Sequence, residues 1–286
     1  MTFTIDSPSP AVLFPGQGSQ TPEMRELVAA TPRLLEACLE LVGEDPFARV
    51  EESTQFAQPA IFCASMASWS RLDVSPRVAA GHSLGELAAL TAAGVLALED
   101  ALRLVVIRGE LMARADDSGS MLALVGGEPA DAAEIAAQVG VTVANDNAPG
   151  QVVLSGDRER LAAAEEVARD RGLRALPLDV AGAFHSPSMA AAVEPFRAAL
   201  DDVELHEPRF PVFSCASAQP FTDVRDELAN ALVRPVRWRE TVLALRDSGA
   251  ESYVDVGPGK VLARLMKRIA PGLKAQSPTF GEPAGV

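Results

Sequence analysis

The sequence predicts an α/β protein in which a small βαββαβ unit interrupts a larger domain. Three observations lead to this prediction. A strand, a glycine-flanked serine and a helix follow one another over 78–90, a second strand runs into a glycine-containing loop over 11–20, and the patterns of 120–186 have the order of a ferredoxin-like unit. We therefore expect a large subdomain of residues 1–119 and 187–286 and a ferredoxin-like small subdomain of residues 120–186.

The composition restricts the class of protein. With 286 residues, 48% of them hydrophobic, the chain can bury a substantial core. We expect a cytoplasmic protein, because no apolar run reaches the roughly 20 residues that span a bilayer and no signal peptide is recognisable. The net charge of −14 argues against binding to nucleic acid. Cys38, Cys63 and Cys215 lack metal-ligand spacing, which predicts buried thiols and no metal site.

The segment Gly81-His82-Ser83-Leu84-Gly85, between a short apolar strand and a helix, has the pattern of a nucleophile elbow. The two glycines permit a tight, strained turn that lifts the Ser83 hydroxyl clear of the sheet. Amides at the start of the next helix face the same point. Such a serine can attack a carbonyl; the alternative is an ordinary turn with a capping serine.

Residues 11–14 are predicted to form a buried strand, and residues 15–20 the tight loop after it. Two glycines let the amides of this loop approach a ligand, with a plain turn as the alternative. The loop lacks the third glycine of a dinucleotide fingerprint and the lysine of a phosphate loop, so no nucleotide cofactor is expected. Helices are expected at 23–42 and from Gln58 to Leu72.

The helix expected at 101–115 carries Arg108 within its apolar stripe. A guanidinium that points inward keeps its charge and is costly to bury without an anion. Either an internal Asp or Glu pairs with it, or a substrate supplies a carboxylate that the guanidinium holds in a bidentate contact.

The remaining elements complete the α/β pattern. In the small unit, strands are expected at 121–125, 141–144, 152–154 and 173–178, and helices at 130–138 and 158–171. Beyond it we expect helices ending near 232 and 245, a strand at 253–256, a closing helix through Ile269 and a loosely ordered tail from Pro271.

The chain has three histidines. His82 adjoins Ser83, but neighbours at the end of a strand point to opposite sides, so it is a poor base for that serine. His206 belongs to a predicted surface loop. His185 lies where the two subdomains meet, a usual place for a cleft, and is the candidate base, with a purely structural role as the alternative.

Four segments together resemble the malonyl-CoA:acyl-carrier-protein transacylase family and the acyltransferase domains of polyketide and fatty acid synthases. They are Phe14-Pro15-Gly16-Gln17-Gly18-Ser19-Gln20, Gly81-His82-Ser83-Leu84-Gly85-Glu86, Arg108-Gly109 and Val256-Gly257-Pro258-Gly259-Lys260. The segments 147–153 and 235–238 add to the match, which runs from about 11 to 270. The resemblance implies an α/β-hydrolase-like core with an inserted ferredoxin-like subdomain.

The same resemblance implies site residues. Ser83 would be the nucleophile that accepts the acyl group, and His185 its general base and later acid. The backbone amides of Gln17 and Leu84 would form the oxyanion hole. Many members have Gln where this chain has Ala231, so a backbone carbonyl would have to orient His185. Many also have Asn in the segment occupied here by Ser214-Cys215.

The resemblance also implies the substrates. Arg108 would clamp the free carboxylate of malonate, and Phe184 would crowd an α-methyl group, which favours malonyl over methylmalonyl. The expected substrates are malonyl-CoA and a phosphopantetheinylated acyl carrier protein, with no cofactor, and the expected state is a monomer. We expect the carrier on one of two basic faces: Lys260, Arg264, Lys267 and Arg268, or Arg158, Arg169 and Arg174.

Three alternatives compete with this interpretation. A serine hydrolase would need an acid to orient the histidine, and Asp179 is the nearest candidate. A transferase could instead serve a polyketide assembly line or malonate decarboxylase. A scaffold that kept the fold without activity is the non-catalytic alternative.

Overall fold

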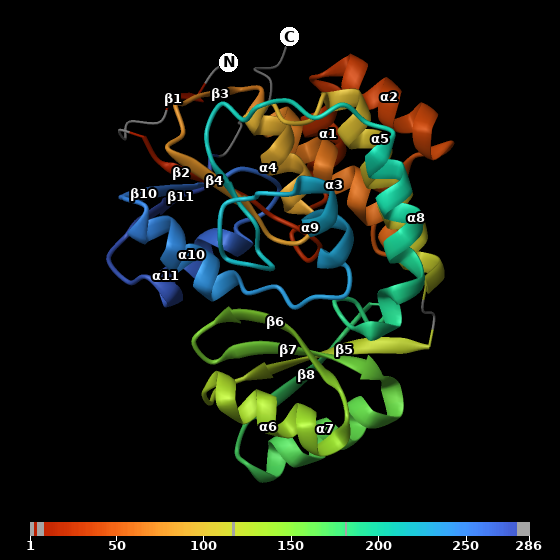
Figure 1. The fold of residues 1–286 in the computed structure, drawn as a ribbon, viewed down its shortest axis with the longest axis vertical. Helices are drawn as coiled ribbons and strands as arrows, with labels where there is room; N and C mark the ends of the chain where they lie inside the picture. Colours follow the sequence, from red (N-terminus) through yellow and green to blue (C-terminus); the bar gives the residue numbers. More distant parts are fainter. Residues whose placement is uncertain (1–2, 5–8, 116–117, 181, 279–286) are drawn as a thin grey trace.

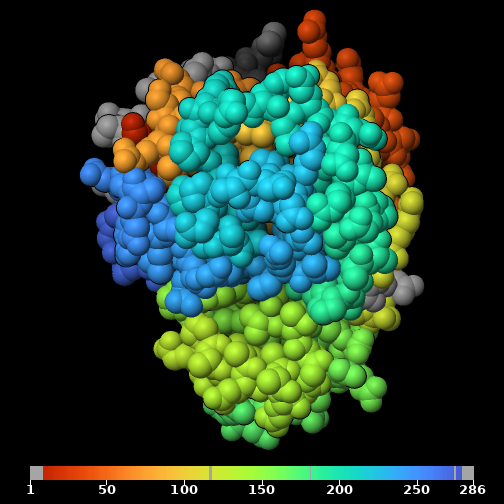
Figure 2. Space-filling view, in the orientation of Figure 1, coloured from red at the N-terminus to blue at the C-terminus, as the bar shows by residue number. Residues whose placement is uncertain are grey.

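The computed structural model describes residues 3–4, 9–115, 118–180 and 182–278. Two sheets organise these residues, one in each of two unequal parts of the molecule (Figure 1). The larger part carries most of the helices, and the smaller part lies below it in Figure 1. In Figure 2 the yellow-green small part lies directly against the blue and cyan segments of the large part.

A five-stranded parallel sheet, in the order β11-β10-β2-β4-β9, forms the centre of the large part. Its strands are β2 (Ala11–Phe14), β4 (Val78–Gly81), β9 (Val212–Phe213), β10 (Ser252–Asp255) and β11 (Lys274–Gln276). Val12 and Phe14 pack into one apolar cluster, and Ala11 and Leu13 into another on the opposite face. The sheet is therefore covered on both faces, which explains why β2 is apolar at every position.

Nine α-helices of the described residues surround this sheet. They are α1 (Met24–Ala29), α2 (Pro32–Val42), α3 (Thr54–Trp69), α4 (Gly85–Ala93), α5 (Leu98–Ala115), α8 (Ala190–Asp201), α9 (Val224–Ala231), α10 (Trp238–Asp247) and α11 (Val261–Ile269). Short 3-10 turns occur at Pro46–Arg49 and Pro187–Met189, and β1 (Phe3–Thr4) pairs with β3 (Leu72–Asp73). In the described part of the chain, no helix is long and apolar enough to cross a membrane.

Two helix predictions in the N-terminal part were wrong in their bounds. The helix expected over 23–42 is interrupted before Pro32, because a residue that precedes proline is disfavoured in the helical region, and Thr31 has φ −127° and ψ 73°. Helix α3 begins at Thr54, four residues before the expected start, since the Ser53 side chain accepts a hydrogen bond from the Gln55 amide. Pro59 consequently lies inside α3.

Two predictions for the C-terminal part also need correction. Only Val224–Ala231 is helical in the stretch that was expected to be helix up to 232. Within the tail from Pro271, β11 pairs in parallel with β10 and extends the sheet, while residues 279–286 lie outside the described residues. Its glycine and proline content suggested a loosely ordered tail. The open edge of β10, however, offers backbone hydrogen-bonding groups with which this short segment pairs.

The small part has the predicted ferredoxin-like order. Its elements are β5 (Gly119–Val125), α6 (Pro129–Val139), β6 (Thr142–Ala148), β7 (Gln151–Asp157), α7 (Arg158–Asp170) and β8 (Arg174–Leu178). The antiparallel sheet has the order β6-β7-β5-β8, and α6 and α7 bury their apolar sides against it around Ile135 and Leu161. The exact division at residues 120 and 186 stays a prediction.

Strand β6 also joins the small part to the large one. The Asp146 amide donates to the Val236 carbonyl and the Val236 amide donates to the Ala144 carbonyl, both at 2.8 Å. Arg239 on α10 pairs with the Asp146 carboxylate at 2.6 Å. These contacts fix the end of β6 against α10, beside the cleft between the two parts.

Candidate active site

Ser83 lies on the sharp turn between β4 and α4. Its φ is +52°, in the left-handed region that side chains rarely occupy. A Cβ at Gly81 would lie 1.9 Å from the Gly85 carbonyl carbon, and a Cβ at Gly85 would lie 2.0 Å from the Phe14 carbonyl oxygen. Both glycines are therefore required for this turn, which has the geometry of the predicted nucleophile elbow.

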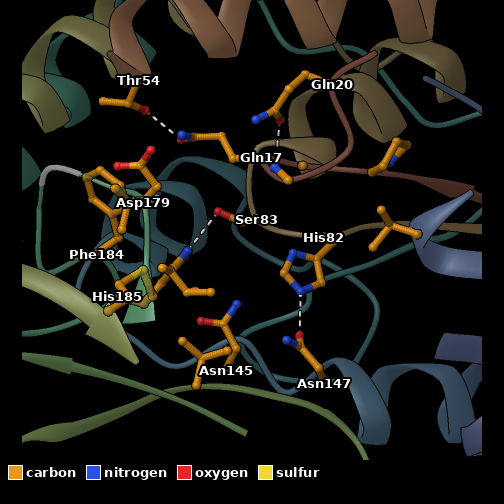
Figure 3. A pocket seen from close by; sticks show the side chains of 18 of the residues that line it. Gln17, Gln20, Thr54, His82, Ser83, Asn145, Asn147, Asp179, Phe184 and His185 are labelled. Carbon is orange, nitrogen blue, oxygen red and sulfur yellow. Dashed lines mark hydrogen bonds between the residues drawn. The ribbon is translucent and has the colours of Figure 1, made fainter. Parts of the chain in front are cut away.

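The Ser83 hydroxyl lies between a histidine and an arginine. Its Oγ is 2.7 Å from His185 Nε2 (Figure 3) and accepts a hydrogen bond from Arg108 Nη2 at 3.1 Å. His185 Nδ1 is 3.0 Å from the carbonyl oxygens of both Ala231 and Arg234. Carbonyls only accept, so Nδ1 carries the proton and Nε2 is free to accept the hydroxyl proton. Backbone carbonyls thus orient His185, as expected from the alanine at 231.

Burial keeps the imidazole neutral. His185 is 4% exposed, and desolvation, followed by the positive charge of Arg108, lowers its pKa to about 3. At neutral pH the ring is therefore a base that is ready to accept a proton. The neutral ring also avoids placing a second cation beside the guanidinium.

Arg108 on α5 is 4% exposed, and burial lowers its pKa to about 10. Its Nη1 donates to the Gln58 side-chain oxygen at 2.7 Å, and Nη2 reaches Ser83. The guanidinium forms no ion pair with any residue that the structure describes. The nearby buried Glu86 instead accepts from the Cys215 amide at 2.7 Å, and burial raises its pKa to about 7. The alternative of a direct internal carboxylate partner is thus not what the structure shows.

The loop after β2 packs directly against the elbow. A Cβ at Gly16 would lie 2.5 Å from the His82 carbonyl oxygen and 3.6 Å from the Leu84 amide nitrogen. This close approach places the Gln17 and Leu84 segments side by side at Ser83. Neither backbone amide has a hydrogen-bond acceptor among the described residues, so both can donate to a ligand. The Gln17 side chain turns away and accepts from the Thr54 hydroxyl at 2.5 Å (Figure 3).

A cavity of about 380 Å³ opens in front of Ser83, between the two parts of the molecule. Its lining includes Gln17, Ser83, Phe184 and His185, of which Phe184 is 6% exposed. Arg108 contacts the Ser83 hydroxyl but is not itself part of the lining. Among the described residues, no group of three or more His, Cys, Asp or Glu side chains is placed to hold a metal ion.

The other acidic and basic candidates form no hydrogen bond with Ser83 or His185 among the described residues. Asp179 lines the cavity, but the Nδ1 atom of His185 that an acid would bind is already directed at two carbonyls, so the hydrolase arrangement is not formed. His82 does not reach Ser83: its Nε2 is 2.8 Å from Asn147 Oδ1, and its ring packs against Trp238. His206 is exposed, away from the cavity.

Sequence reasoning missed two polar residues of α3, Thr54 and Gln58. Gln58 is fully buried and bonded to Arg108, and Thr54 joins it to Gln17. A signal was available, because Gln58 is a polar residue within an apolar helical run, as Arg108 is on α5. The neighbouring Pro59 instead suggested that Gln58 marks the start of a helix.

A doubly covered parallel sheet that presents a serine on a strained strand-to-helix turn, with a neutral histidine at hydrogen-bond distance, defines the class of α/β enzymes that form and break acyl esters. Within this class, the chain belongs to the acyl transferase domain family, whose sequence profile matches residues 12–277.

Individual relatives are similar over nearly their whole length. The malonyl CoA-acyl carrier protein transacylase of Bacillus subtilis (strain 168) is 36% identical over 289 residues, 92% of this chain and 91% of that protein. The crystal structure of malonyl-CoA:acyl carrier protein transacylase from Xanthomonas oryzae pv. oryzae has a TM-score of 0.88 and 35% identity, covering 97% of this chain and 95% of that one. A malonyl-transacylase in complex with its type II polyketide synthase acyl-carrier protein has a TM-score of 0.88 and 33% identity, covering 95% and 96%.

Proposed function

We propose that this protein transfers a malonyl group from malonyl-CoA to the phosphopantetheine thiol of an acyl carrier protein through a malonyl ester on Ser83. One observation carries the proposal: the Ser83 hydroxyl lies between a neutral histidine and a buried arginine that forms no direct ion pair with a carboxylate of the described chain. Such an arginine is suited to an acyl group that brings its own carboxylate.

In the first half-reaction, Ser83 Oγ attacks the thioester carbon while its proton passes to His185 Nε2. The oxyanion that forms accepts hydrogen bonds from the Gln17 and Leu84 amides. The carbon–sulfur bond then breaks, and the coenzyme A sulfur takes the proton from His185. This leaves malonyl-Ser83 and a neutral imidazole.

The second half-reaction repeats the same steps with a new nucleophile. The carrier's thiol gives its proton to His185 and attacks the ester carbon, and Ser83 Oγ leaves with that proton. All bonds are made by the serine, the histidine and the two substrates, so the proposal needs no cofactor. Phe184, buried in the cavity wall, would crowd an α-methyl group and favour malonyl.

For the carrier protein, the structure favours the basic face of α11 over that of the small subdomain. Lys260, Arg264 and Lys267 are exposed there, and the apolar side of the same helix lines the cavity. Arg268 is already bonded to the Gln151 side chain and the Pro149 carbonyl. On the alternative face, Arg169 pairs with Glu165. We further propose that the protein acts as a cytoplasmic monomer.

Intact-mass spectrometry tests the proposed function. The protein is mixed with malonyl-CoA, acetyl-CoA or methylmalonyl-CoA, with Ser83→Ala and Arg108→Ala alongside. A malonyl adduct that is lost in Ser83→Ala, is strongly reduced in Arg108→Ala and passes to added carrier protein is the expected result. Equal loading of acetyl and malonyl groups, or an adduct that only water removes, would overturn the proposal.

A further inference from the structure

The segment between α9 and α10 supplies both hydrogen-bond acceptors of His185. The carbonyl oxygens of Ala231, the last residue of α9, and of Arg234 each lie 3.0 Å from His185 Nδ1. Within this segment the turn is loosely bonded, because the Leu232 and Arg234 amides donate only at 3.4 Å. The position of the Arg234 carbonyl therefore depends on contacts with neighbouring elements.

Strand β6 of the small part makes one set of these contacts. The Val236 amide donates to the Ala144 carbonyl, and the Val236 carbonyl accepts from the Asp146 amide, both at 2.8 Å. Pro235 stands between Val236 and Arg234. Its ring fixes its own φ and restricts the residue before it to extended conformations. A displacement of β6 would therefore reach the Arg234 carbonyl through a stiff connection.

The side chains of β6 have partners in two directions. Asn145 and Asn147 line the cavity (Figure 3). Asp146, between them, is not part of that lining and instead meets Arg239 of α10. The contact is forked: Arg239 Nε lies 3.1 Å from Asp146 Oδ1 and 3.0 Å from Oδ2, and Nη2 lies 2.6 Å from Oδ2. One ion pair thus joins the cavity strand of the small part to a helix of the large part.

This ion pair is partly shielded from water. The Asp146 side chain is 15% exposed and the Arg239 side chain 29%. The neighbouring pair at the start of α10, Arg237 with Glu240, is 40% and 41% exposed. A forked and partly shielded contact is stronger than an exposed one, so the Asp146 pair is suited to hold β6 in a fixed position.

We propose that Asp146 and Arg239 are positioning residues for His185. Their ion pair holds β6 against the large part and so keeps the Arg234 carbonyl on the imidazole Nδ1. The inference rests on the proposed function and deepens it. With the ion pair formed, Nδ1 keeps its proton and Nε2 faces Ser83. Without it, the Arg234 carbonyl can move away, and the ring loses one of the two acceptors that select this tautomer.

Two single substitutions, Asp146→Asn and Arg239→Gln, break the ion pair from either side. Each should lower the initial rate of Ser83 acylation at saturating malonyl-CoA by about threefold to tenfold, because a displaced base accepts the proton less well. The rate is measured by intact mass. The double variant should be no slower than the slower single variant, since both substitutions remove the same contact.

Glu240→Gln is the matched control. It makes the same change from acid to amide on the same helix and breaks the pair with Arg237, whose guanidinium otherwise bonds to the Ser217 carbonyl and not to β6. Its acylation rate should equal that of wild type.

A second measurement separates positioning from a simple loss of folded protein. The chain has three histidines, so protein labelled with ¹⁵N-histidine gives few ring signals, and His185→Gln assigns the one of interest. The readout is the rate at which the proton on His185 Nδ1 exchanges with water. It should be at least about threefold faster in Asp146→Asn and Arg239→Gln than in wild type, because local opening exposes the ring. Glu240→Gln should leave it unchanged.

Slower acylation together with faster exchange supports the inference. An unchanged acylation rate, or slower acylation with unchanged exchange, would overturn it, as would a control that behaves like the two variants of the ion pair. If one of these variants does not fold, the other decides by the same two readouts. The exchange measurement needs no substrate. It therefore tests the position of His185 even if wild type forms no malonyl adduct, an outcome that would refute the proposed function.

Discussion

Ser83 and His185 both have left-handed backbones, with φ values of +52° and +55°, and their side chains meet at 2.7 Å. Each residue is a non-glycine in a region that costs about 1 kcal/mol or more. The two strained positions lie on segments 102 residues apart, one from the elbow and one from the segment that returns from the small subdomain. Rigid packing around both segments therefore maintains the contact that the proposed chemistry requires.

The elbow should not tolerate a methyl group at its second glycine. A Cβ at Gly85 would lie 2.0 Å from the Phe14 carbonyl oxygen, so Gly85→Ala must displace β2 or α4. We expect a loss of about 3 kcal/mol or more in the free energy of unfolding, measured by urea titration. Gly172→Ala is the control, with a φ of +74° but nothing within 4 Å of the added atom. It should cost only about 1–2 kcal/mol, and equal losses would contradict the steric argument.

Removing the Phe184 ring should broaden the range of acyl groups. The ring lies in the cavity wall next to His185, and a pocket contact with one methyl group discriminates by about 1–3 kcal/mol. Phe184→Ser should therefore raise loading of methylmalonyl relative to malonyl by about tenfold, as read by intact mass. An unchanged ratio would show that another part of the wall selects against the methyl group.

The stability of the protein should depend on pH through Asp255. Burial raises the pKa of this carboxyl from 3.8 to about 7, and its Oδ1 has no hydrogen-bond partner among the described residues. The folded state therefore binds more protons than the unfolded state between these values, so this contribution to stability is present at low pH and is lost as pH rises toward 7. Urea titrations should show that the free energy of unfolding changes less between pH 5 and pH 8 in Asp255→Asn than in wild type. An equal change in the two proteins would exclude Asp255 as the source of this pH dependence.

Charge reversal on α11 should separate the two half-reactions. Arg264→Glu combined with Lys267→Glu removes exposed cations without touching the cavity-lining side of the helix. Transfer of malonyl to carrier protein should fall by about tenfold or more, whereas self-acylation by malonyl-CoA should be unchanged. Arg158→Glu with Arg174→Glu tests the alternative face and should leave both steps intact. If the double variant on α11 also lost self-acylation, the substitutions would have damaged the active site rather than a docking surface for the carrier protein.

The sequence located the parts of the site that depend on local rules. The glycines around Ser83 predict a tight turn. The position of Arg108 in an apolar stripe predicts a buried charge. Both patterns are confined to a few neighbouring positions of the sequence. Contacts between segments are a different matter. Nothing local indicates that Gln58 meets Arg108, since this pair forms only when the chain folds. That a backbone carbonyl orients His185 was expected only from the family resemblance around Ala231.

The fold shows the same division. The alternation of strands and helices was sufficient to predict a ferredoxin-like unit, because each element buries its own apolar face. Strand β11 could not be predicted from its composition, since it exists through pairing with β10. The break before Pro32 was visible in the sequence, but the apolar pattern on both sides suggested one continuous helix.

The joint between β6 and α10 bears on the construction of chimeras. Asp146 belongs to the small subdomain and its partner Arg239 to the large one, and the main chain at Asn145 forms a parallel bridge with Val236. A graft cut at the ends of the small subdomain would carry only half of this joint. If the grafted subdomain lacks an acid at the position of Asp146, Arg239 is left unpaired beside the cleft. An exchange of subdomains should therefore transfer Asp146 and Arg239 together.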